Sequence, residues 1–152
     1  MTYIDDPLDP APLEIIPGLL PRHGHLALMA ETNVGKTLLT PEIIESVLTG
    51  RPLWGTLIPT EVYTRAVYIV GEYDENYIKQ LWKKLNASTL PKTVQLLPRK
   101  TLIYNGQLQV EAFDWYKTQC QGAQLVAFDP FSAFVVGTEV ENDASLTRHA
   151  VN

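Results

Sequence analysis

The sequence predicts an α/β fold of three layers, in which a mainly parallel sheet lies between helices. Two observations support this prediction: short apolar runs alternate with segments of helical periodicity, and the runs are apolar at nearly every position. Strands buried on both faces have this composition, and they are typical of parallel sheets covered by helices. Because ligands of such sheets bind at the carboxyl ends of the strands, polar residues that follow the runs are candidate site residues.

The strands are expected where the apolar runs fall. Buried strands are predicted at residues 25–30, 66–70 and 125–128, and a short additional strand at 93–97. The first and third runs end in turn chemistry, and the second is rich in β-branched and aromatic residues.

The helices follow from apolar residues at helical spacing, which predicts helices over 37–48, 76–86 and 108–120. Gly50 is a stop signal for the first helix, and Asp74 can cap the second. The third is expected to bury Val110, Phe113 and Tyr116, and Asn142 can cap a last helix. Pro41 removes one backbone donor early in the first helix, where a bend is expected.

Composition indicates one soluble globular domain in a reducing compartment. The chain has 152 residues, 45% of them hydrophobic, which is enough for one core without a disulfide or a metal. Its 12 basic and 17 acidic residues give a net charge of −5, which argues against a general polyanion-coating role. The single cysteine, Cys120, cannot pair within the chain. With no secretory signal and no apolar run long enough for a bilayer, we expect a cytoplasmic protein without membrane contact.

Residues 30–37 form a candidate phosphate-binding loop between a predicted strand and a predicted helix. They read Ala30-Glu31-Thr32-Asn33-Val34-Gly35-Lys36-Thr37, and only Ala30 departs from the pattern G-x-x-x-x-G-K-[ST]. In such a loop, backbone N–H groups and the helix N-terminus surround phosphate oxygens, and the lysine reaches the β and γ phosphates. The Thr37 hydroxyl can ligate Mg²⁺. The alternative is an ordinary strand-to-helix turn that contains a lysine.

Asp129 directly follows the run at 125–128. A carboxylate at this strand end, in the same sheet as the phosphate loop, can hold Mg²⁺ through water. The alternative is a turn or helix-capping aspartate, because Asp-Pro is common in turns. The presence of the phosphate-loop pattern favours the metal-binding interpretation.

Glu72 lies just past the run at 66–70, where a carboxylate can polarise a water for in-line attack on a γ-phosphate. Asp74 and Glu75 are alternatives, and a solvated acidic loop is the interpretation without a catalytic role. We favour Glu72 because a strand end fixes the direction of a side chain better than a loop does. The predicted catalytic residues are therefore Glu72 and Lys36.

These motifs together resemble the RecA-like P-loop ATPases, and among them the branch that includes plasmid RepA-type and DnaB-type hexameric helicases. The resemblance runs from about Ile16 to the end of the sequence, and it rests on the segments 16–21, 30–37, 50–55, 67–72 and 125–131 together with Gly24. It implies a Mg²⁺-dependent domain that binds and hydrolyses ATP. Glu72 matches the catalytic glutamate of the family and Asp129 its magnesium-coordinating aspartate. DnaB-type loops often begin with Ala, as here at Ala30.

The resemblance also implies a ring-shaped homo-oligomer that acts on nucleic acid in DNA replication. Residues 130–143 would then face the channel, yet they contain Glu139, Glu141 and Asp143 and no Lys or Arg, so they offer phosphates nothing. RecA-like cores continue past the Asp129 strand, and one later strand lies between it and the phosphate-loop strand. Five prolines within residues 1–21 predict a proline-rich N-terminal arm. On the family comparison, residues 22–152 are the N-terminal part of an ATPase core that is incomplete at its C-terminal end.

Two other functions stay open from the sequence. In RecA-like cores the segments after the Asp129 strand carry a polar sensor residue and an arginine or lysine finger, and none is visible in this sequence. Their absence suggests a non-hydrolysing nucleotide-binding or assembly module, and hydrolysis is expected only if the remaining core segments are supplied. A P-loop kinase would need an arginine-rich lid, and the five arginines of the chain are not clustered.

Overall fold

The centre of the computed structural model, which describes residues 12–29, 35–86 and 93–137, is a three-stranded parallel sheet. Its strands are β3 (Ala66–Val70), β4 (Val94–Pro98) and β7 (Leu125–Asp129), in the order β4-β3-β7. β3 lies in the middle and is buried along its whole length, because it pairs in parallel with both neighbours. These three strand predictions are confirmed to within one residue at each end.

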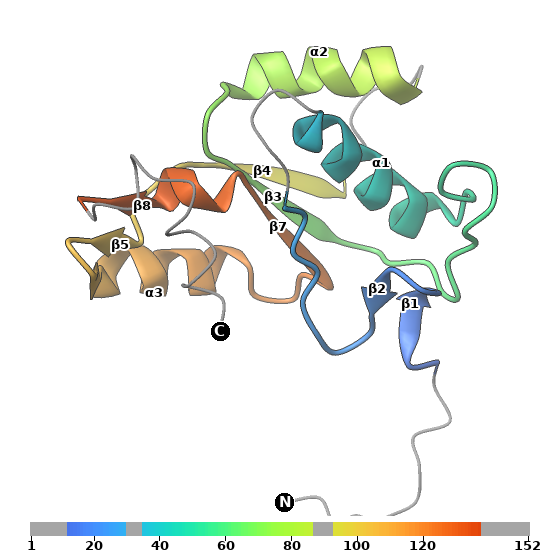
Figure 1. Ribbon diagram of the computed structural model, residues 1–152, viewed down its shortest axis with the longest axis horizontal. Coiled ribbons are helices and arrows are strands. Elements are labelled where there is room, and N and C mark those ends of the chain that lie inside the picture. Colours follow the sequence, from blue (N-terminus) through green and yellow to red (C-terminus); the bar gives the residue numbers. More distant parts are fainter. Residues whose placement is uncertain (1–11, 30–34, 87–92, 138–152) are drawn as a thin grey trace, which may run out of the picture.

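Helices cover both faces of this sheet, which confirms the predicted three-layer α/β architecture (Figure 1). On one face lie α1 (Lys36–Thr49) and α2 (Glu75–Asn86), and on the other lies α3 (Val110–Gln119). Alternate residues of β3 supply the two cores: Tyr68 packs with Ile44 and Ile78, whereas Ile69 packs with Tyr116 and Phe134. The sheet is therefore buried between two apolar layers.

The ends of the first two helices follow the expected local chemistry. Gly50 ends α1 in a left-handed conformation (φ 73°) and donates its N–H to the Ser46 carbonyl at 2.8 Å. The Asp74 carboxylate accepts the N–H of Tyr77 at 2.8 Å, and so caps α2 as predicted. α1 continues through Pro41, whose side chain is fully buried, so the proline does not end the helix.

Residues 25–29 form no strand, so the strand prediction for 25–30 is wrong over the part that the structure describes. Leu28 and Met29 are 37% and 63% exposed rather than buried. A strand needs a hydrogen-bonding neighbour, and among the described residues β7 pairs only with β3. Within residues 12–29, 35–86 and 93–137, no strand lies beside this apolar segment for it to pair with.

The third helix begins two residues later than predicted. Leu108 belongs instead to β6 (Gln107–Leu108), which forms a small sheet with β5 (Ile103–Tyr104) and β8 (Val135–Val136). A 3₁₀ helix, η1 (Phe131–Phe134), connects β7 to β8. Of the three residues expected to be buried by α3, only Tyr116 is; Val110 and Phe113 are 62% and 46% exposed. Tyr116 packs against the sheet, while Val110 and Phe113 point outward from the helix.

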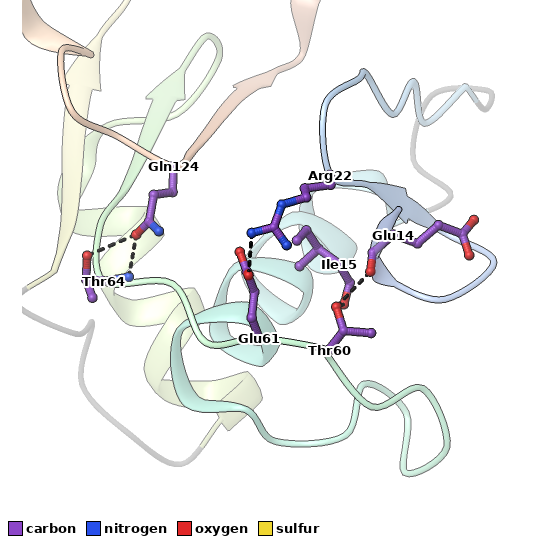
Figure 2. Close-up of polar contacts among 7 residues, drawn as sticks. All are labelled: Glu14, Ile15, Arg22, Thr60, Glu61, Thr64 and Gln124. Atoms are coloured by element: carbon purple, nitrogen blue, oxygen red, sulfur yellow. Dashed lines mark hydrogen bonds and ion pairs between the residues drawn. The ribbon is translucent and has the colours of Figure 1, made fainter. Parts of the chain in front are cut away.

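The last part of the predicted arm is a short hairpin of β1 (Glu14–Ile16) and β2 (Leu20–Pro21), which packs on α1 through Ile15, Ile16 and Leu20. Figure 2 shows how polar contacts fix it: Arg22 forms a 2.7 Å ion pair with Glu61, and Thr60 Oγ1 donates to the Glu14 carbonyl at 2.7 Å. Residues 1–11 of the arm, and the helix expected after Asn142, lie outside the described residues. No helix in the described ranges has the length and apolar character that a membrane span requires.

Candidate functional site

The N-terminus of α1 is shaped by one glycine. Gly35 precedes the helix with φ 92° and ψ 20°, a left-handed conformation that residues with a side chain rarely adopt. Lys36 and Thr37 are the first two residues of the helix, so Thr37 lies in the turn whose N–H groups have no partner within the helix. Such a terminus favours anions. The predicted loop residues 30–34 and the side chain of Lys36 lie outside the described part of the structure.

Asp129 ends β7 at the edge of the sheet that faces the start of α1. Asp129 is 6% exposed, and it lies opposite Val70, the last residue of β3, in the parallel ladder. The backbone ladder continues one step further, because Gly71 donates its N–H to the Asp129 carbonyl at 2.8 Å. A Cβ on Gly71 would lie 2.7 Å from the Cβ of Ala133, so only glycine fits this close approach. The carboxyl ends of β3 and β7 therefore stay side by side in register.

Three elements meet at the Asp129 carboxylate. Its Oδ1 lies 3.5 Å from the hydroxyl oxygen of Thr37 on α1, and its Oδ2 accepts a 2.7 Å hydrogen bond from the hydroxyl of Tyr68 on β3. Burial, together with the neighbouring Asp129 carboxylate, raises the pKa of Tyr68 far above its usual range. The Tyr68 hydroxyl thus stays protonated and acts as a donor to the carboxylate.

Thr37 and Asp129 fit a Mg²⁺ ion in both chemistry and spacing. Hydroxyl and carboxylate oxygens are hard donors, and two oxygens that bind one Mg²⁺ directly at about 2.1 Å lie at most about 4.2 Å apart; a carboxylate that holds the ion through water has a wider range. The 3.5 Å separation of Thr37 Oγ1 and Asp129 Oδ1 meets that limit. Among the described residues no group of three or more His, Cys, Asp or Glu side chains is placed so that it could hold a metal ion. A single carboxylate suits a Mg²⁺ ion that takes its other ligands from phosphate and water.

The three acidic residues after β3 are used differently. Asp74 caps α2, and Glu75 lies 3.7 Å from Lys79 in an exposed ion pair. Glu72 is exposed, and its carboxylate forms no hydrogen bond and no ion pair with the described residues. It lines a cavity of about 590 Å³ at the carboxyl ends of β3 and β4, together with Asp74, Glu75 and Arg99. The structure thus brings Thr37 and Asp129 together, whereas Glu72 lines the cavity at the ends of β3 and β4.

Sequence reasoning missed Tyr68, although a signal for it exists. A tyrosine in the middle of a strand buried on both faces needs a partner for its hydroxyl. Tyr68 lies two residues before Val70 and therefore on the same face, the face toward which Asp129 points when the two strand ends are level. The identity of the partner requires the strand order and register, which the local pattern does not contain.

A parallel sheet between helices, with the start of the first helix beside the carboxyl end of a strand, is the arrangement of the P-loop NTPase-like proteins. A family model described as an AAA domain matches residues 4–152, so the chain belongs to this AAA domain family. The resemblance to P-loop ATPases is thereby confirmed, and nucleotide binding is the function class that membership brings. No curated protein and no solved structure gives a significant match to the chain.

Proposed function

We propose that this chain is a Mg²⁺-dependent ATP-binding domain that hydrolyses ATP, with its relatives among plasmid and phage replicative helicases. The observation that supports it most is the 3.5 Å approach of Thr37 to Asp129, two residues that are 92 positions apart in the sequence. A hydroxyl in the first turn of a phosphate-loop helix and a carboxylate at a strand end are the side chains that hold magnesium in P-loop enzymes.

Each predicted site residue has a role in this proposal. The backbone of residues 30–37 cradles the phosphates, and Lys36 reaches the β and γ phosphates. Thr37 and Asp129 hold the Mg²⁺ ion, which when bound neutralises charge on the phosphate oxygens. Glu72 accepts a proton from the attacking water. Its exposure lets a water reach it, although hydrolysis also requires that its carboxylate be oriented toward the nucleotide.

The test compares ATP binding and turnover in the wild type, Lys36→Ala and Glu72→Gln. Lys36→Ala is expected to weaken ATP binding by tenfold or more, because the phosphate contact is lost. Glu72→Gln should leave binding within about threefold and reduce turnover by about 100-fold or more, since it removes a general base. Titration calorimetry measures binding, and phosphate release measures turnover.

Glu75→Gln is the matched control, because it removes an exposed carboxylate from the same segment. It should leave both binding and turnover unchanged. If a folded wild type binds no Mg-nucleotide at millimolar concentration, the site assignment fails. If Glu72→Gln turns over ATP as fast as the wild type, the base lies elsewhere.

A second function, a nucleotide-binding or assembly module without hydrolysis, is favoured by one observation. Among the described residues no group holds the exposed Glu72 carboxylate in a fixed direction, and a general base works only when it is positioned. Detectable ATP binding with no phosphate release, with and without single-stranded DNA, would support the module.

The wider part of the proposal is a homo-oligomeric ring that acts on nucleic acid, which rests on the resemblance alone. Light scattering with and without MgATP measures the oligomeric state. A rise in ATP turnover on adding single-stranded DNA would support the motor, whereas a MgATP-bound monomer that is indifferent to DNA would contradict it.

A further inference from the structure

Tyr68 has two parts with different surroundings. Tyr68 is completely buried, and its ring packs in the core between the sheet and the helices α1 and α2. Its hydroxyl is a polar group inside that apolar layer, where a donor without a partner is costly. The hydroxyl reaches Asp129 Oδ2 at 2.7 Å in a fully buried hydrogen bond.

The register of the sheet explains why this tyrosine reaches the strand end. Tyr68 is directly opposite Ala127 in β7, and Asp129 lies two residues further along on the same face. A diagonal neighbour at this distance is within reach of an aromatic side chain. A shorter residue at position 68 could fill part of the core, but it could not bring a donor to Asp129.

The two carboxylate oxygens of Asp129 consequently have separate partners. Oδ2 is taken by Tyr68, and Oδ1 faces Thr37 at 3.5 Å. The terminal torsion of an aspartate is broad, so a carboxylate without a second contact rotates over a wide range. The bond from Tyr68 fixes this torsion and turns one oxygen toward the start of α1.

We propose that Tyr68 is a positioning residue that holds the Asp129 carboxylate ready for a divalent cation beside Thr37. This inference rests on the proposed Mg²⁺-dependent nucleotide site and adds to it a residue outside the motifs. Tyr68 touches neither cation nor nucleotide, and it acts only through Asp129.

Tyr68→Phe tests the inference, because phenylalanine keeps the ring and removes only the hydroxyl. The affinity for ATP is measured by calorimetry twice, with Mg²⁺ and with the metal removed by EDTA. We expect the affinity with Mg²⁺ to fall about fivefold or more, the loss of a hydrogen bond to a charged group, and the metal-free affinity to stay within twofold. A Tyr68→Phe protein with the wild-type ratio of the two affinities would overturn the inference.

Tyr116→Phe is the matched control. Tyr116 is also buried, and its hydroxyl donates to the Pro98 carbonyl at 3.0 Å and accepts the Lys100 N–H at 2.6 Å, on the other face of the sheet. This variant should keep both affinities. An equal loss of Mg²⁺-dependent affinity in both variants would mean that any buried hydroxyl matters, and the specific role of Tyr68 would fail.

A double-mutant cycle tests whether Tyr68 acts through Asp129. In the Asp129→Ala background, Tyr68→Phe should cause no further change in Mg²⁺-dependent affinity, and an additive loss would contradict the coupling. The effect of Mg²⁺ alone on the melting temperature, measured with and without 10 mM MgCl₂, separates a failure of the proposed function from a failure of the role of Tyr68. If the wild type binds Mg²⁺ but no ATP, the proposed function fails, while the change in melting temperature caused by Mg²⁺ in the wild type and in Tyr68→Phe still tests the role of Tyr68. If the wild type binds neither, both fail.

Should Tyr68→Phe not fold, the wild type carries the test through ¹³C labelling at the tyrosine ζ carbons. Addition of MgCl₂ should move the ζ-carbon resonance of Tyr68 and leave that of Tyr116 in place. A Tyr68 resonance that does not respond to a cation that is bound would refute the inference.

Discussion

At the scale of single residues, Asp129 has several polar contacts that fix its position. Its oxygens face Thr37 and Tyr68, and its backbone carbonyl accepts the N–H of Gly71. Glu72 is the opposite case, since its carboxylate is exposed at a strand end. The two acidic residues thus suit different tasks: one is held in a fixed place, and the other is open to water.

Cys120 offers a clean measurement at this scale because it is the only cysteine of the chain. Burial raises the pKa of its thiol, and the nearby Arg65 only partly offsets this. The raised pKa leaves less thiolate at pH 8, and the thiolate is the reactive form. Alkylation at pH 8 is therefore expected to be several-fold slower in the folded protein than in urea.

The alkylation rate of Cys120 in the folded protein should rise about tenfold per pH unit up to its raised pKa, so the rise should end at a higher pH than for a free thiol. Because the folded-state pKa lies above the unfolded one, this group's contribution to stability is present at low pH and is lost as the pH rises through the folded value. Equal alkylation rates with and without urea would contradict the burial of the thiol.

At the scale of elements, α1 and α2 are joined by a buried hydrogen bond. Trp82 of α2 is fully buried, and its indole N–H donates to the Glu45 carboxylate of α1 at 2.8 Å. Glu45 is itself only 6% exposed, so the indole is what satisfies it in an apolar layer. The helix that carries Thr37 and the helix that follows Glu72 are tied together at this point.

Trp82→Phe should lower the free energy of unfolding by about 2–4 kcal/mol, because it leaves a cavity and removes a donor from a buried carboxylate. Glu45→Gln keeps an acceptor oxygen and should cost about 1 kcal/mol. Urea denaturation measures both. Trp54→Phe is the control: Trp54 is 53% exposed, and a loss within about 0.5 kcal/mol is expected. Equal losses for the two tryptophans would contradict the structural role of the bond.

The elements with strong local patterns were predictable from the sequence. The strands at β3, β4 and β7, the helix α1 and its Gly50 end, and the Asp74 cap of α2 all depend on apolar spacing and capping chemistry within a few residues. The strand expected at 25–30 was not predictable in this way, because its formation depends on a neighbour elsewhere in the chain. The same applies to Leu108, which pairs in a hairpin although its spacing fits a helix.

The proximity of Thr37 and Asp129 was predictable to the same extent, whereas their roles stay predictions. Thr37 and Asp129 belong to motifs whose position relative to a strand or helix is a local property, and the structure brings them together. Tyr68 was not found, because its partner is set by strand register. The loop residues 30–34 and the side chain of Lys36 lie outside the described residues, so their roles stay predictions.

At the scale of the whole molecule, nucleotide binding should increase the free energy of unfolding and raise the melting temperature. A ligand at 100 times its dissociation constant stabilises a protein by about 2.7 kcal/mol, which for a chain of this size raises the melting temperature by roughly 5–10 °C. We expect this rise with MgATP and a smaller one with ATP and EDTA, as measured by calorimetry. Lys36→Ala should show little rise. A rise of the same size in Lys36→Ala would mean that ATP stabilises the fold from another site.

The distances along the chain between the residues that meet at Asp129 also set an order in time. Thr37 and Tyr68 lie 92 and 61 positions before Asp129, and contacts that close long loops cost more chain entropy than local ones. During synthesis, the strands of the β1–β2 hairpin and the β3–β4 ladder can pair before the ribosome has released β7, which then adds to the free edge of β3. The carboxylate at the end of β7 is then the group that completes the site, after most of the scaffold that receives it has been made.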